Sequence, residues 1–141
     1  MCLFLGIFIT GIFAQDIPPQ PVLEGTGSTS WYGDYIIWED VFCNGEYVES
    51  FTGPMVWHNI SHFVNGAEVW ETSQAIGELT SSSGEVFHVN EIVRQSYSDD
   101  LITWHGNLKG NMGSHYVYSF TSSLDWTNIT IEKTGCPGNN K

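Results

Sequence analysis

Basic residues are scarce in this sequence. Four Lys and Arg stand against sixteen Asp and Glu in 141 residues, which gives a formal net charge of -12 at neutral pH. A charge of this sign disfavours nucleic acid and anionic membrane surfaces as partners. The acidic residues are scattered along the chain rather than clustered. This distribution favours a role in solubility over calcium collection.

Long apolar segments are also missing. The one apolar run, residues 3–13, is shorter than the roughly 20 residues that span a bilayer and has the length of a signal-peptide core. Ala14 is a small residue suited to a cleavage site, and the proline-rich stretch that follows breaks regular structure. We therefore predict a signal peptide over residues 1–14, a disordered linker over 15–30 and a single β-rich domain over 31–141. The protein is expected to be secreted, to the periplasm or the extracellular space.

Only three cysteines occur. Cys2 would leave with the signal peptide, so Cys43 and Cys136 remain as an even pair in an oxidising compartment and predict a disulfide. Closing a loop of about 95 residues would stabilise the fold by about 4–5 kcal/mol in the chain-entropy model. Two sequons begin at Asn59 and Asn128 and predict glycosylation if the source is eukaryotic.

A long helical stripe of apolar residues is absent as well, whereas β-branched and aromatic residues are common from Trp31 onward. Short extended runs alternate with Gly, Asn and Ser turn signals. The predicted strands cover residues 34–43, 46–52, 55–64, 67–76, 85–95, 101–108, 114–122 and 127–133. Eight strands with short connections predict an all-β, antiparallel, up-and-down β-barrel, and a two-sheet β-sandwich is the alternative.

Asn65-Gly66 lies between two alternating runs, which is the strongest short hairpin signal. A two-residue turn places Glu71 opposite Ile60, with His58 and His62 as its diagonal neighbours. Two imidazoles and one carboxylate in this arrangement can hold a divalent metal or act as an acid/base pair. Apart from this possible metal, no cofactor is predicted. The alternatives are a hydrogen-bonded Glu–His network inside the barrel and ordinary polar residues that face the solvent.

The opposite face of the predicted hairpin carries Trp57 and Trp70 among Asn, Ser, Thr and Gln. Flat aromatic rings beside hydrogen-bonding groups suit a sugar-binding platform, and they suit a protein core equally well. His88 and His115 are further candidate binding residues, because on a closed barrel they can line the same interior as the other histidines.

Three functions follow from these patterns. The first is a binding protein that holds a small apolar or amphipathic molecule inside a barrel, since eight strands enclose room for one small ligand. The second is an enzyme using His58, His62 and Glu71. The third is a glycan-binding module using Trp57 and Trp70. The sequence lacks the common hydrolase, zinc-protease, EF-hand and phosphate-loop motifs, which favours binding over catalysis.

The order of several short motifs resembles a group of small secreted all-β proteins of unknown function. These motifs are Cys43-Asn-Gly-Glu46, Gly53, His58-x-x-x-His62, the turn at 80–84, Asn107, Gly110, His115 and Cys136. In that group the late strand has a second histidine where this chain has Ser119. The resemblance implies the fold and the disulfide across residues 43–136, and it implies no activity.

Overall fold

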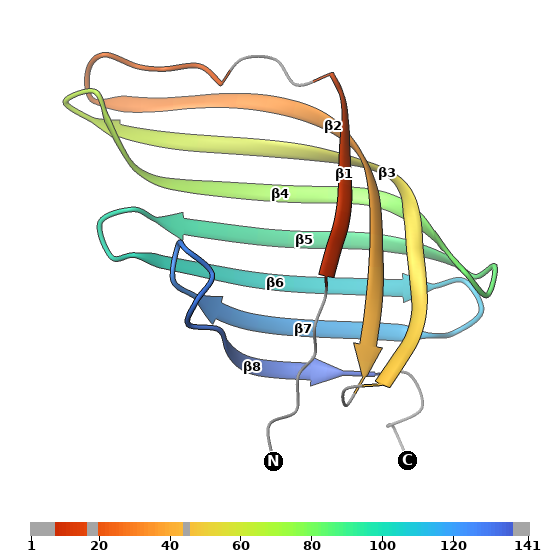
Figure 1. Ribbon diagram of the computed structural model, residues 1–141. Coiled ribbons are helices and arrows are strands. Elements are labelled where there is room, and N and C mark those ends of the chain that lie inside the picture. Colours follow the sequence, from red (N-terminus) through yellow and green to blue (C-terminus); the bar gives the residue numbers. More distant parts are fainter. Residues whose placement is uncertain (1–7, 17–19, 44–45, 137–141) are drawn as a thin grey trace.

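The computed structural model describes residues 8–16, 20–43 and 46–136 and consists of one antiparallel sheet (Figure 1). Each strand pairs with the next one along the chain. The strands are β1 (Phe8–Asp16), β2 (Gly27–Cys43), β3 (Glu46–Val64), β4 (Ala67–Ser81), β5 (Val86–Ser96), β6 (Leu101–Gly110), β7 (His115–Ser122) and β8 (Thr130–Gly135). Within the described residues there is no helix, and so none that could cross a membrane. The predicted all-β antiparallel class is confirmed.

The sheet is open. In the described ranges no ladder joins β8 to β1 or β2, so neither closed-barrel nor sandwich packing is shown. Figure 1 shows β2 and β3 bending across the other strands, which brings the end of β2 near the end of β8. There Cys43 and Cys136 form a disulfide with a Cα–Cα distance of 6.2 Å. The predicted disulfide is confirmed.

The break predicted between the strands 46–52 and 55–64, at the turn residues Gly53-Pro54, is wrong. The chain continues through it, so the predicted strands 46–52 and 55–64 form the single strand β3. A Cβ atom on Gly53 would lie 2.3 Å from the carbonyl oxygen of Glu78, and one on Gly77 would lie 2.3 Å from that of Pro54. The missing side chains allow the backbones of β3 and β4 to approach closely where the two strands bend.

The N-terminal part contains more strand than predicted. β2 begins at Gly27, so residues 27–30 of the predicted linker are strand, and Gln20 Nε2 donates to Ser61 Oγ at 3.3 Å. β1 lies largely within the predicted signal peptide and pairs with β2 between Asp34 and Asp40. Cleavage of that peptide stays a prediction. Its residues 1–7, linker residues 17–19 and a predicted turn at 44–45 lie outside the described residues.

The hydrophobic core lies on the inner face of the curved sheet. Phe51 packs edge-on against Phe87 with ring centroids 4.8 Å apart and against Tyr116 at 5.6 Å. The other buried members of this cluster are Ile37, Val41, Met55, Ala75, Leu79, Val89, Leu108 and Tyr118. Side chains at alternate positions of each strand point to the opposite, outer face.

Candidate functional site

The β3–β4 hairpin turns where the sequence predicts. Asn65 has φ 51° and Gly66 has φ 80°, and Val64 pairs with Ala67. Positive φ at both central residues is the geometry that Asn-Gly favours in a two-residue hairpin turn. Farther from the turn the predicted pairing is wrong. Phe63 pairs with Glu68 but His62 pairs with Trp70, so β4 has one extra residue, Val69, at a β-bulge.

This bulge separates the three residues of the predicted metal or acid/base site. Glu71 pairs with Ser61 instead of Ile60 and is only 9% exposed on the inner face. His58 and His62 alternate with buried neighbours and lie on the outer face. A single inserted residue reverses which face the following side chains occupy. The described residues contain no group of three His, Cys, Asp or Glu side chains placed to hold a metal.

Glu71 is held by hydroxyl groups instead. Ser61 Oγ donates to Glu71 Oε2 at 3.1 Å, and Ser73 Oγ lies 3.2 Å from Glu71 Oε1 and 2.6 Å from Asn59 Oδ1. Burial raises the pKa of Glu71, and the nearby charge of Glu68 adds to this effect, while the two serine hydroxyls lower it. Glu71 therefore belongs to a network of serine hydroxyl groups on the inner face, and the alternative of a hydrogen-bonded Glu–His network is not found.

The two tryptophans of the predicted sugar platform lie on opposite faces. Trp57 points inward, where its ring lies 6.2 Å from that of Trp104 and 6.0 Å from that of Tyr35. Trp70 points outward and is 40% exposed. Trp57 thus belongs to the core, and a platform that combines it with Trp70 is wrong for the same reason as the metal site.

His58 and His62 each take part in a small outward-facing group. The ring of His58 stacks on Tyr32 with centroids 4.3 Å apart and planes at 7°, and Ser30 Oγ lies 2.9 Å from its Nε2. The ring of His62 stacks on Trp70 at 5.2 Å and 16°, and Ser28 Oγ lies 2.9 Å from its Nδ1. Each group therefore combines an aromatic ring, an imidazole and a hydroxyl.

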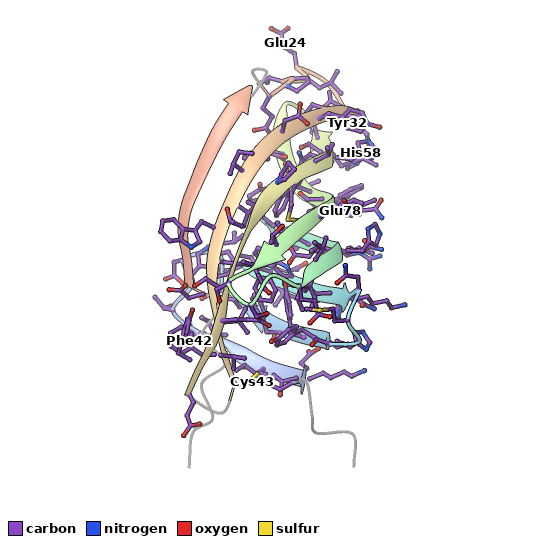
Figure 2. The ribbon with its side chains drawn as sticks, turned by 90° about the vertical axis from the view of Figure 1, so that its right-hand side faces the viewer. Glu24, Tyr32, Phe42, Cys43, His58 and Glu78 are labelled. Atoms are coloured by element: carbon purple, nitrogen blue, oxygen red, sulfur yellow. A yellow bond between two sulfur atoms is a disulfide. The ribbon has the colours of Figure 1, made fainter. Side chains whose placement is uncertain are left out.

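Tyr32 is 59% exposed, and Figure 2 shows it on the same side of the sheet as His58 and Glu78. Between the two aromatic groups lie the ladder partners Ile60 and Thr72. We call this surface the aromatic–histidine face and define it by Tyr32, His58, His62 and Trp70. The sequence contains these residues, but only the bulge at Val69 places Trp70 beside His62.

His88 and His115 also lie on the outer face and do not line the interior. His88 pairs with Lys109, and Lys109 pairs with His115, so the three form one row across β5, β6 and β7. His115 Nε2 lies 3.0 Å from Asn107 Oδ1. The proposed role of these two histidines in an interior site is not supported by their position.

The two predicted glycosylation sites differ in position. Asn59 is inward and 3% exposed, so a glycan on its side chain would not fit in this fold. Asn128 is exposed in the connection between β7 and β8. Glycosylation at Asn128 stays a prediction.

Sequence reasoning missed a pair of carboxyl groups in the interior. Glu39 and Glu91 are both buried, and the Tyr118 hydroxyl donates to Glu91. Burial and the neighbouring Glu91 raise the pKa of Glu39 to about 8, and burial raises the pKa of Glu91 to about 7. The alternating pattern of the sequence carried a signal for both residues. Glu39 shares the inward positions of its strand with Ile37 and Val41, and Glu91 shares those of its strand with Val89 and Val93.

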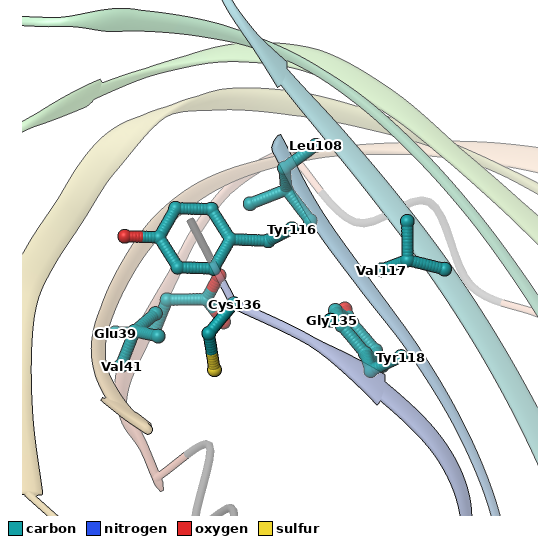
Figure 3. Close-up of a pocket in the computed structure, with 8 residues that line it drawn as sticks. All are labelled: Glu39, Val41, Leu108, Tyr116, Val117, Tyr118, Gly135 and Cys136. Carbon is teal, nitrogen blue, oxygen red and sulfur yellow. The ribbon is translucent and has the colours of Figure 1, made fainter. Parts of the chain in front are cut away.

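A small pocket lies between β2, β7 and the end of β8 (Figure 3). Its lining includes Glu39, Tyr116, Tyr118 and Cys136. Its volume is about 10 Å³, which is about the room that one water molecule needs. This pocket does not hold a small organic ligand.

Comparison with models of protein families, with curated proteins and with solved structures finds no match to this chain. The proposal for the function of this chain therefore depends on the geometry of the site alone.

Proposed function

We propose that this chain is a secreted glycan-binding protein whose recognition surface is the aromatic–histidine face. The observation that carries this proposal is the exposure of two stacked aromatic groups, Tyr32 with His58 and Trp70 with His62, on one face of the sheet. The C–H groups of a sugar ring carry partial positive charge and complement the negative face of an aromatic ring. Trp70 thereby keeps the role predicted from the sequence, and Tyr32 takes the place of Trp57.

Neighbouring side chains suit the same ligand. Ser28 and Ser30 supply hydroxyl groups beside the two histidines, and Gln74 is the ladder partner of His58. Hydroxyl and amide groups can both donate and accept, as the hydroxyl groups of a sugar require. The exposed apolar residues Val56 and Ile76 pair with each other next to this surface. Grouped exposed apolar residues are typical of binding surfaces.

The test uses a panel of immobilised polysaccharides and three single variants. We expect Tyr32→Ala and Trp70→Ala each to weaken binding by roughly twofold to tenfold, since one aromatic contact contributes about 0.5–1.5 kcal/mol. Tyr47→Ala is the matched control, because Tyr47 is an exposed aromatic residue near the start of β3, away from this face. Equal loss in all three variants, or no bound polysaccharide at all, would refute the proposal.

A ligand in the interior is a second candidate, supported by a separate observation. The indole N–H groups of Trp31 and Trp57 and the amide nitrogen of Asn59 are buried without a hydrogen-bond partner among the described residues. Trp31 pairs with Asn59, so these donors lie close together. Buried unpaired donors are rare and suit a small amphipathic molecule with acceptor oxygens. The test is binding of anilinonaphthalene sulfonate: a rise in melting temperature supports this candidate, and a fall shows binding to unfolded chains only.

For the fold, we propose that the mature chain closes into the predicted barrel once the signal peptide is removed. Cleavage would free the β2 edge at residues 34–40 that β1 covers. Because β2 and β8 run in the same direction in a sequential antiparallel sheet, their pairing would be parallel. The disulfide holds their ends together. Slow amide hydrogen exchange along this β2 edge in the mature protein supports closure, and fast exchange contradicts it.

A further inference from the structure

Charged side chains are unevenly divided between the two faces of the sheet. The outer face of β3, from Ser50, through β7 carries Arg94, Lys109 and every histidine of the chain. The histidines are His58, His62, His88, His105 and His115. Glu78 is the one carboxylate on this part of the surface within the described residues. This cationic side of the sheet contrasts with the net charge of -12.

The acidic groups lie elsewhere. Five of them are buried on the inner side: Glu39, Glu49, Glu71, Glu85 and Glu91. On the strands that flank the outer face, β2 carries Asp34 and Asp40, and β8 carries Glu132, which accepts a hydrogen bond from Ser119. The other described acids lie near turns or strand ends. An anion that approaches the outer face therefore meets few carboxylates.

The charge of this face depends on pH. At neutral pH it carries two permanent cations, Arg94 and Lys109, and one carboxylate, Glu78. Histidine is the side chain whose charge changes between about pH 8 and pH 5. All five histidines of the chain lie on this face. Exposed imidazoles at His88, His105 and His115 can make direct contact with a ligand.

We propose that the outer face binds an anionic glycan, a carboxylated or sulfated polysaccharide, more tightly in mildly acidic than in neutral solution. This rests on the proposed function and names the class of glycan and the regulation of the same surface. The charges extend over the ladder in a way that suits a polymer. His58 and His105 lie in one row three strands apart, about 14 Å. The row of His88, Lys109 and His115 lies four residues farther along β5, and Glu78, the carboxylate of this face, pairs with His88 at the β4 end of that row.

The aromatic rings favour a glycan over other polyanions. Tyr32 and Trp70 lie beside the histidines, so one chain segment of a polysaccharide can stack on a ring and place its acidic group on an imidazole. The remaining surface is acidic and repels a large, uniformly charged partner such as a DNA duplex. A flexible chain that follows the cationic strip avoids this repulsion.

The test compares dextran sulfate with uncharged dextran at pH 5.5 and pH 7.5 and at constant ionic strength, by calorimetry. We expect dextran sulfate to bind at least tenfold more tightly at the lower pH, and dextran to show no such change. The double variant His88→Gln, His115→Gln should reduce this ratio by roughly fourfold or more, since one exposed ion pair is worth about twofold to fivefold. The control is Lys133→Gln on β8. Lys133 pairs with Ser119 on the outer side of the sheet, so this variant also removes a positive charge there, but it removes no imidazole and should keep the ratio.

Each of the other outcomes refutes one named part of this inference or of the proposed function. An affinity for dextran sulfate that does not change with pH, or an equal loss in Lys133→Gln, refutes the histidine switch. Equally tight and equally pH-dependent binding of a DNA duplex refutes the assignment to a glycan. If neutral glycans bind through Tyr32 and Trp70 and anionic glycans bind no more tightly, this inference is refuted and the proposed function is not. Conversely, pH-dependent binding of dextran sulfate that survives Tyr32→Ala and Trp70→Ala refutes the role of the aromatic residues in the proposed function.

Discussion

The buried carboxyl pair predicts that this protein becomes less stable as the pH rises from 5 to 9. Glu39 and Glu91 are neutral in the folded chain below their raised pKa values of about 8 and about 7. In the unfolded chain they lose their protons near pH 4.5. Between these values the folded state holds more protons, so its stability falls with rising pH. The contribution is fully present below pH 4.5 and is lost as the pH passes the folded pKa values.

The magnitude follows from the difference in pKa. Moving the pKa of one carboxyl from 4.5 to about 8 is equivalent to about 5 kcal/mol. This is of the order of the whole stability of many domains. Because the two groups interact, they titrate as a pair, and we expect one broad loss of stability rather than two steps.

The assay is urea unfolding followed by tryptophan fluorescence at pH values from 5 to 9. Glu39→Gln keeps the shape and polarity of the side chain but cannot ionise, so its free energy of unfolding should vary much less with pH. Glu78→Gln is the matched control, because it makes the same substitution at an exposed carboxylate of the outer face. If both variants keep the pH profile of the original protein, ionisation of Glu39 is not the cause and the reasoning fails.

Three further predictions concern stability and modification. Replacing both Cys43 and Cys136 with Ala should lower the free energy of unfolding by about 4–5 kcal/mol, measured in urea against the oxidised protein, because it opens a loop with a sequence separation of 93 residues. Gly77→Ala should lower the melting temperature more than Gly84→Ala. A Cβ atom at Gly77 would lie 2.3 Å from the Pro54 carbonyl oxygen, whereas at Gly84 nothing lies within 4 Å. Equal shifts in melting temperature would contradict the close approach of β3 and β4. In a eukaryotic secretion host, peptide mass spectrometry should find a glycan on Asn128 and none on Asn59, and full occupancy of Asn59 would contradict its inward position.

Local signals in the sequence predicted local structure well. Asn65 and Gly66 turn the chain where expected because both tolerate positive φ, which is a property of the residues themselves. The disulfide followed from the count of cysteines and the predicted oxidising compartment. Alternating patterns and frequent turn residues predicted the antiparallel sheet. Each of these depends on a few neighbouring residues or on composition, and tertiary contacts did not change the result.

The prediction of the candidate site was wrong because it depended on the pairing of β3 with β4, which is set by tertiary contacts. Residues 67–71 give no sign that Val69 is an extra residue, yet this bulge decides that Glu71 points inward and Trp70 outward. Gly53-Pro54 has the composition of a turn, but close packing against β4 keeps the chain extended. The interior glutamates were assigned to solubility, because net charge says nothing about which acids are buried.

The disulfide has a consequence for the order of events during synthesis. Cys43 lies at the end of β2, and Cys136 follows β8. A chain that enters an oxidising compartment N-terminus first exposes Cys43 while its partner is still being made. The native bridge can therefore form only after the strands from β3 to β8 have been delivered. The native disulfide therefore forms after the whole sheet has been made. Chains that end before residue 136 lack the partner of Cys43 and keep its thiol unpaired.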